Sequence, residues 1–116
     1  MKRIGKHEVY SQMAKVFSQR GTCGRLQVGA IAVSEGRIIS SSYNGPPPNS
    51  THCTVFKCDL KKSCTRAIHA EANLISWAAR KGLKLEGTTL YLTHSPCIKC
   101  CELILQAGIK EVYYIE

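Results

Sequence analysis

The sequence has no run of about eighteen apolar residues, the length that a helix needs to cross a membrane. Residues 1–6 are mostly polar and basic, so they do not form an apolar signal-type stretch. Internal repeats and low-complexity tracts are also lacking. These absences predict one cytoplasmic protein domain, spanning residues 1–116, with no membrane partner.

Aromatic residues make up only 7% of the chain, and no aromatic-rich strand is interleaved with Lys or Arg. Such a strand is typical of proteins on which single-stranded nucleic acid stacks, so we expect no nucleic-acid partner. Acidic residues are also scarce: eight stand against 16 Lys and Arg, a formal net charge of +8. Nucleic acid, a phosphorylated small molecule and a plain solvated surface all remain compatible with this charge.

Cysteine, in contrast, is abundant, with seven residues. An odd number fits poorly with a closed set of disulfides, and a reducing compartment favours thiols. The cysteines are also clustered rather than scattered. We therefore expect metal binding.

The N-terminal half predicts one helix and a pair of strands. Apolar residues recur at helical spacing between His7 and about Gln19, where we expect an inward face. That face consists of Val9, Met13, Val16 and Phe17. Over residues 27–34 apolar residues occupy both sets of alternating positions, which would face opposite sides of a strand. This pattern predicts a strand that is covered on both faces. A turn at Glu35-Gly36 then leads into a strand over 37–43, so the two strands should form a hairpin.

From Asn44 to about residue 63 the pattern predicts irregular chain, unusually long for a connection between elements. His52, Cys53, Cys58 and Cys64 fall in or beside this segment. A metal bound by these residues would hold the irregular segment in place.

The C-terminal half predicts two helices and two strands. We expect helices over 67–80, ending at Gly82, and from Pro96 to about 107, ending before Gly108. Strands are expected over 88–93 and 111–115. Residues predicted to point inward from the first of these helices are Ala70, Leu74, Trp77 and Ala78. The order of elements predicts an α/β fold with a mixed sheet whose later strands are parallel through right-handed crossovers.

Two short motifs carry the chemistry: His69-Ala70-Glu71 and Pro96-Cys97-Ile98-Lys99-Cys100. One imidazole and two thiolates are three protein ligands, the number that a catalytic zinc keeps when a fourth position stays open for water. His-x-Glu followed by Pro-Cys-x-x-Cys is the signature of zinc-dependent nucleobase deaminases. We therefore expect zinc on His69, Cys97 and Cys100. All three residues should lie in the first turns of the two predicted helices.

Glu71 is the expected proton carrier. It would take a proton from zinc-bound water, leave hydroxide to attack a ring carbon, and deliver protons to the ring nitrogen and the departing amine. Residues two apart on a helix point to nearly opposite sides, so Glu71 must reach the site from over the helix end. The alternatives are a carboxylate that only stabilises the helix dipole, and a buried His69 without metal.

The chain resembles the cytidine deaminase superfamily, and most of all the compact phage and bacterial deoxycytidylate (dCMP) deaminases. The segments that carry this resemblance are residues 22–30, 43–46, 52–53, 69–73, 92–100 and 106–110. It implies a three-layer cytidine-deaminase-like fold with about three helices.

The resemblance also implies contacts with the substrate. The backbone at Ala70 would meet the pyrimidine carbonyl, the carbonyl near Ser95 would accept from the exocyclic amine, and Asn44 would lie beside the sugar. Asn44-Gly45 reads equally well as a plain turn. Arg25 is a candidate for the 5′-phosphate, because a guanidinium suits that group, but a solvated surface arginine is an equal alternative.

Some members of the family bind a second, structural zinc. Here Cys23, Cys53, Cys58 and Cys64 would supply a closed site of four thiolates, with His52 as an alternative ligand or the thiols left free. Cys101 would point away from the catalytic metal, and we expect it to be a core thiol.

Many relatives continue beyond the equivalent of Glu116 with another helix and a fifth strand. We therefore expect a four-stranded sheet, or a five-stranded one. Family members commonly form hexamers that respond to dCTP and dTTP, which makes a homo-oligomer and these effectors expectations here. Mg²⁺ is expected only together with a nucleotide effector.

The leading hypothesis is an enzyme that deaminates dCMP to dUMP with release of ammonia. Its rivals in the same class act on tRNA adenosine, cytidine, guanine or dCTP. A different class is a basic binding module stapled by zinc and without activity, for which the net charge and the cysteines are the support.

Overall fold

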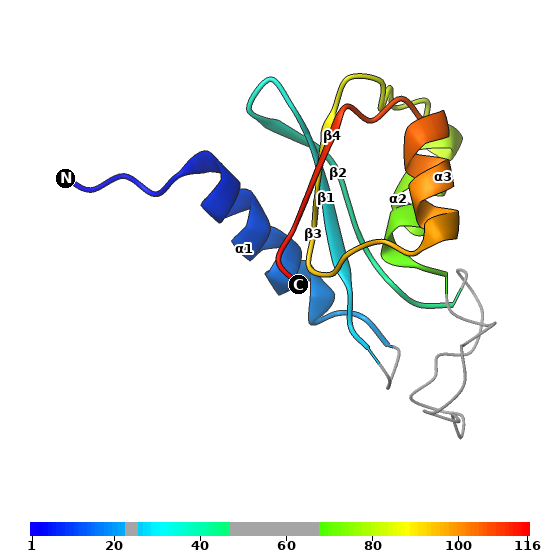
Figure 1. Cartoon of the computed structure of the whole chain (residues 1–116), viewed down its shortest axis with the longest axis horizontal. Coiled ribbons are helices and arrows are strands. Elements are labelled where there is room, and N and C mark those ends of the chain that lie inside the picture. Colours follow the sequence, from blue (N-terminus) through cyan, green and yellow to red (C-terminus); the bar gives the residue numbers. More distant parts are fainter. Residues whose placement is uncertain (23–25, 47–67) are drawn as a thin grey trace.

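The computed structural model describes residues 1–22, 26–46 and 68–116. These residues form three helices and one mixed, four-stranded sheet with the strand order β2-β1-β3-β4 (Figure 1). The elements are α1 (Lys6–Ser18), β1 (Gly29–Ser34), β2 (Arg37–Tyr43), α2 (Ala70–Lys81), β3 (Thr89–Leu92), α3 (Ile98–Gln106) and β4 (Glu111–Tyr114). The predicted α/β class is confirmed, with four strands in the described part of the chain.

The strand pairing follows the predicted pattern. β1 and β2 are antiparallel neighbours joined at Glu35 and Gly36. Both turn residues have positive φ, 52° and 74°, which matches the backbone twist of a tight two-residue hairpin. β1 also pairs antiparallel with β3, and β3 pairs parallel with β4. The hairpin and the parallel later strands were both expected from the sequence.

The sheet separates two apolar layers, with α1 on one face and α2 and α3 on the other (Figure 1). Successive residues of β1 serve the two layers in turn, since side chains alternate along a strand. Ile31 and Val33 pack with Ala14 of α1, whereas Ala30 and Ala32 pack with Leu74 of α2. The prediction that this strand is covered on both faces is confirmed.

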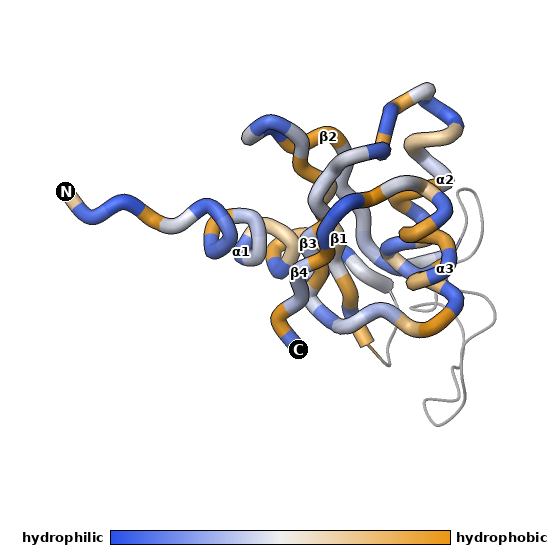
Figure 2. The backbone as a smooth tube through the Cα atoms, turned by 45° about the horizontal axis from the view of Figure 1, so that its top comes forward, coloured by the Kyte–Doolittle hydropathy of each residue, from blue (hydrophilic) through white to orange (hydrophobic). Residues whose placement is uncertain are grey.

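α1 packs closely on the sheet at Gly29. A Cβ atom added at Gly29 would lie 1.9 Å from the carbonyl oxygen of Ala14. The helix therefore needs glycine at the start of β1. Residues 1–5 precede α1 and extend away from the sheet as a mostly hydrophilic segment (Figure 2).

Two apolar residues that we predicted to be inward are exposed. Val16 is 61% exposed, because the inward face of α1 follows Ala14 and Ser18, and two residues of helix turn a side chain to nearly the opposite side. Trp77 is 43% exposed and lies beneath the cationic groups of Arg80 and Lys81. The smaller Ala78 takes the inward position. Of the remaining α2 residues predicted to be inward, Ala70 and Leu74 are fully buried.

α1 lies within one residue of its predicted bounds, whereas α2 and α3 end near their predicted residues but begin later. Gly82, with φ of 69°, caps α2 in the left-handed conformation that glycine adopts at least cost. α2 begins at Ala70 and α3 at Ile98, so the predicted starts at residue 67 and at Pro96 were too early. In the described ranges, none of the helices has the length and apolar character required to span a membrane.

Candidate active site

The N-terminal ends of α2 and α3 bring three potential metal ligands together. His69 is the residue that caps α2, Cys97 caps α3, and Cys100 lies in the first turn of α3. The Nδ1 atom of His69 lies 3.6 Å from Sγ of Cys97 and 3.3 Å from Sγ of Cys100. All three ligand atoms lie within 4.8 Å of one another. The two halves of the sequence motif therefore meet.

The local backbone explains why His69 precedes its helix. Gly45 and Ile68 form an isolated antiparallel bridge, with N–H to carbonyl distances of 3.1 and 2.7 Å. Pairing of Ile68 requires extended backbone, and His69 after it is extended too, so the helix begins at Ala70. His69 was predicted inside the first turn but has extended φ and ψ, −62° and 149°.

Cys97 shows the same shift. It was predicted in the first turn after a helical Pro96, but it is itself the extended cap residue, with φ of −72° and ψ of 169°. Pro96 therefore lies one residue before the cap rather than at the first helical position. Both corrections leave the ligand atoms together, because the caps lie at the same two helix ends.

The donor set and its spacing fit zinc. Tetrahedral zinc with bonds of about 2.3 Å to sulfur and about 2.05 Å to nitrogen places those two ligand atoms about 3.6 Å apart. The nitrogen–sulfur distances of 3.6 and 3.3 Å agree with this spacing. Three protein donors leave one tetrahedral position for water or substrate, as in catalytic rather than structural sites. The positive ends of two helix dipoles further favour thiolates here.

Glu71 lies beside these ligands and is 4% exposed. Burial raises the pKa of the Cys100 thiol above its ordinary value, and the negative charge of Glu71 raises that pKa further, with smaller contributions from Cys97. A carboxylate that only stabilised the helix dipole would lie in solvent, so this burial favours a role in the site. A metal cation would reverse the pKa effect and stabilise the thiolate.

Cys101 is not the core thiol that we predicted. It is exposed, and its Sγ atom lies 3.9 Å from the carbonyl oxygen of Pro96. α3 buries Cys100 and Ile104, and Cys101 is turned away from that face by about 100°. Cys101 also lies outside the group of three ligands.

Asn44, which follows β2, hydrogen-bonds to the segment that precedes β1. Its amide nitrogen donates to the carbonyl of Leu26 at 2.7 Å, and its amide oxygen accepts from the backbone N–H of Val28 at 2.8 Å. The residue is buried. Both ends of the amide thus fix the segment that leads into β1.

Ser42 and Asn73 position the start of α2 but were given no role from the sequence. The hydroxyl of Ser42 donates to the carbonyl of Ala70, and the side chain of Asn73 donates to the carbonyl of Tyr43 at 2.9 Å. Both bonds join the end of β2 to the first turn of α2. The position of Asn73 in the His-Ala-Glu-Ala-Asn motif was the only available signal.

Of the other predicted site residues, two lie in the part of the chain that the structure describes and the rest lie outside it. Ala70 is fully buried as the first residue of α2. Ser95 is exposed, and its N–H donates to the carbonyl of Glu116 at 2.7 Å. The remaining predicted residues lie outside the described residues: Cys23, Arg25, His52, Cys53, Cys58 and Cys64.

Comparison with known proteins is consistent with this site. The family model described as the cytidine and deoxycytidylate deaminase zinc-binding region matches residues 4–116. The ComE operon protein 2 of Bacillus subtilis is 41% identical over 117 residues, which cover 100% of this chain and 62% of that protein. The chain thus spans less than two thirds of the length of this relative.

Two phage proteins match over more of their length. The deoxycytidylate deaminase of Mycobacterium phage D29 is 34% identical over 126 residues, covering 98% of this chain and 97% of its own. The dCMP deaminase of cyanophage S-TIM5, in complex with dCMP and dUMP, has a TM-score of 0.86 and 35% identity, covering 98% of this chain and 83% of that one. With its His-Cys-Cys ligand group and a family match over nearly its whole length, the chain belongs to the cytidine and deoxycytidylate deaminase family with this zinc-binding region.

Proposed function

We propose that this chain catalyses the hydrolytic deamination of dCMP to dUMP with release of ammonia. The observation that carries the proposal is the meeting of His69, Cys97 and Cys100 beside the buried carboxylate of Glu71. Its similarity to dCMP deaminases, one of them in complex with dCMP and dUMP, supports the choice of substrate.

His69, Cys97 and Cys100 would hold the zinc ion. When bound, zinc lowers the pKa of a coordinated water, so that a nucleophile is available near neutral pH. The reaction joins the water oxygen to C4 of the pyrimidine and breaks the bond between C4 and the exocyclic nitrogen. Water supplies two protons, one of which ends on the ring nitrogen N3 and the other on the leaving ammonia.

Glu71 would carry both protons. A carboxylate accepts a proton when the water attacks and returns it to a nitrogen of the substrate within the same site. The 4% exposure of Glu71 limits the access of bulk water, so protons taken up there pass to the substrate rather than to solvent. The proposed proton transfer therefore depends on the buried position of the Glu71 side chain.

We propose four substrate contacts around this centre. The N–H of Ala70 is at the first position of α2, where backbone donors have no acceptor within the helix, and it would bind the pyrimidine carbonyl. The carbonyl of Ser95 would accept from the exocyclic amine, and Arg25 would bind the 5′-phosphate. Asn44 already uses both ends of its amide on Leu26 and Val28, so it would act on the sugar through the segment that it holds.

A second zinc on Cys23, Cys53, Cys58 and Cys64 is part of the proposal. Its support is the number of thiols and their place in and around a long segment with few apolar residues. His52 would replace one thiol only if that thiol stayed free. We also propose a cytoplasmic homo-oligomer of hexameric order, regulated by dCTP and dTTP, with Mg²⁺ required only by such an effector.

A substrate panel tests the proposed reaction. Zinc-loaded protein should release ammonia from dCMP faster than from dCTP, cytidine, guanine or an adenosine-containing RNA hairpin. Turnover of only the RNA hairpin would contradict the dCMP reaction and favour a tRNA adenosine deaminase. A protein that turns over none of these, and keeps a binding activity when Glu71 is changed to alanine, would instead be a binding module.

A further inference from the structure

The short segment between β3 and α3 leads directly to Cys97, the residue that caps α3. Cys100 is 3% exposed and is fixed by packing in the apolar core. Cys97 is exposed and makes no side-chain capping hydrogen bond with its own helix. Its carbonyl accepts from the N–H of Cys101 at 2.9 Å, so α3 fixes one side of Cys97. Residues 93–96, which connect it to the end of β3, fix the other side.

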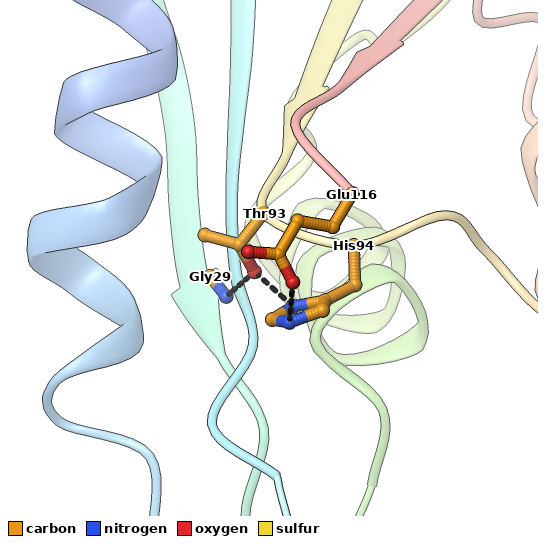
Figure 3. A network of polar contacts seen from close by, with 4 residues as sticks. All are labelled: Gly29, Thr93, His94 and Glu116. Atoms are coloured by element: carbon orange, nitrogen blue, oxygen red, sulfur yellow. Dashed lines mark hydrogen bonds and ion pairs between the residues drawn. The ribbon is translucent and has the colours of Figure 1, made fainter.

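A network of polar side chains holds the first part of this segment (Figure 3). The N–H of Gly29 donates to the hydroxyl oxygen of Thr93 at 3.1 Å, and the same oxygen lies 2.8 Å from Nδ1 of His94. The Nε2 atom of His94 faces a carboxylate oxygen of Glu116 at 3.5 Å. His94 thus bridges the end of β3 and the residues that follow β4.

The donors and acceptors in this network are consistent with one another. A carboxylate only accepts, so the nitrogen that faces Glu116 presents its N–H. In the neutral ring Nδ1 is then the acceptor for the hydroxyl proton of Thr93, whose oxygen still accepts from Gly29. Each polar group has a partner.

The two contacts of His94 differ in strength. Thr93 is 5% exposed, so its bond to His94 is protected from water. The Glu116 side chain is 74% exposed, and ion pairs at such positions contribute little. The bond to Thr93 is therefore the main anchor of the imidazole.

The backbone completes the attachment on both sides of His94. Glu116 donates its N–H to the carbonyl of Thr93 at 3.1 Å and accepts from the N–H of Ser95 at 2.7 Å. Pro96 restricts the backbone of Ser95 to extended conformations. Through its own hydroxyl Thr93 joins this segment to Gly29 of β1, and the ring of His94 bonds to the same hydroxyl.

We propose that His94 is a positioning residue for the metal centre. His94 bonds to the hydroxyl of Thr93, which itself accepts from Gly29 of β1, and it faces Glu116. It thereby fixes the direction in which residues 95–97 leave β3, so that Cys97 meets His69 and Cys100. The inference rests on the proposed function only in taking zinc as the metal, and its test needs no substrate.

The test is a zinc competition against a chromophoric chelator, with thermal unfolding measured for each variant. His94→Ala should weaken zinc binding by about tenfold or more, as loss of residues that orient metal ligands commonly does. His94→Asn keeps an acceptor near the place of Nδ1 and should recover most of the affinity. His94→Gln places its amide beyond that point and should resemble alanine. Glu116→Gln should change the affinity by no more than about threefold.

His7→Gln is the matched control. His7 also bonds through Nδ1 to a hydroxyl, that of Tyr91 at 2.7 Å, but on the face of the sheet that α1 covers. This variant should keep the zinc affinity of the unchanged chain even where its unfolding temperature falls. Unchanged zinc affinity in His94→Ala, equal affinities for His94→Asn and His94→Gln, or an equal loss in His7→Gln would overturn the inference. Failure of the unchanged chain to deaminate dCMP would contradict the proposed function alone.

Discussion

The Nδ1 atom of His69 lies 3.3 Å from the Sγ atom of Cys100, although 31 residues separate them in the chain. One residue belongs to the start of α2 and the other to the first turn of α3. The contact exists because the two helices share one face of the sheet and begin at the same end of it (Figure 1). Packing of this layer is therefore a condition for metal binding.

Neighbouring cysteines give a direct test of the ligand set. Cys100→Ser should reduce zinc binding at this centre by about 100-fold or more, because a hydroxyl is a far poorer zinc ligand than a thiolate. Cys101→Ser, one residue along, should bind zinc as the unchanged chain does, since its thiol is exposed and outside the group. Chelator competition measures both. Equal losses in the two variants would contradict the assignment.

Glu71→Gln separates proton transfer from metal binding. The amide has nearly the same shape but cannot carry a proton, so we expect kcat for dCMP to fall by about 100-fold to 10,000-fold. Zinc content should stay unchanged, because Glu71 is not one of the three ligands. Glu102→Gln, at an exposed position of α3, is the control and should keep its rate. A Glu71→Gln protein with the unchanged rate would exclude the proposed proton carrier.

Metal content tests the second zinc site. Protein purified without chelator should contain about two zinc ions per chain if Cys23, Cys53, Cys58 and Cys64 form a four-thiolate site. Replacing Cys58 by serine should lower the content towards one and leave His69, Cys97 and Cys100 loaded. A content near one in the unchanged chain, with four thiols titrating in the native protein, would refute the second site.

Tyr91 should make the free energy of unfolding depend on pH in the alkaline range. Burial raises its pKa above the ordinary value, and the charges of Tyr113, Tyr10 and Glu111 raise that pKa further. A raised pKa in the folded state means that the contribution to stability is fully present below the unfolded value of about 10 and is lost as pH rises through the folded value.

The free energy of unfolding should therefore fall between about pH 8 and about pH 11, and less steeply in Tyr91→Phe. Denaturant titrations at the two pH values measure the difference. Tyr114→Phe, which removes a hydroxyl at a 56% exposed position, controls for the substitution. Equal slopes in the unchanged chain and Tyr91→Phe would contradict the prediction.

Of the glycines that the structure describes, Gly29 has the least room for a side chain. Its added Cβ would lie 1.9 Å from the Ala14 carbonyl oxygen and 2.7 Å from the Ser18 nitrogen, both backbone atoms of α1. Gly29→Ala should destabilise the fold by about 3 kcal/mol, the upper end of typical overpacking. Gly5→Ala, where a Cβ meets nothing within 4 Å, should cost at most about 1 kcal/mol. Thermal or denaturant unfolding measures both, and similar costs would show that α1 can shift.

Local patterns in the sequence predicted much of the fold. β2 has the predicted bounds, residues 37–43, because the turn at Glu35-Gly36 and the alternation after it are both local signals. The early starts predicted for α2 and α3 were wrong because helix propensity does not report the pairing of Ile68 with Gly45 or the extended caps. The inward positions predicted for Val16 and Trp77 were wrong because helical spacing gives a face but not its centre.

The sequence by itself determined the kind of chemistry. A histidine, a glutamate and two cysteines at fixed spacings near two helix starts specify ligand types and a proton carrier, since spacing along a helix fixes local geometry. Only the tertiary structure decided that these helix starts face each other, that Glu71 is buried beside Cys100, and that His94 is joined to Thr93 and Glu116. Those relations depend on how the helices and the parallel strands pack across the sheet. Packing is set by apolar contacts between residues far apart in the chain, which no local spacing encodes.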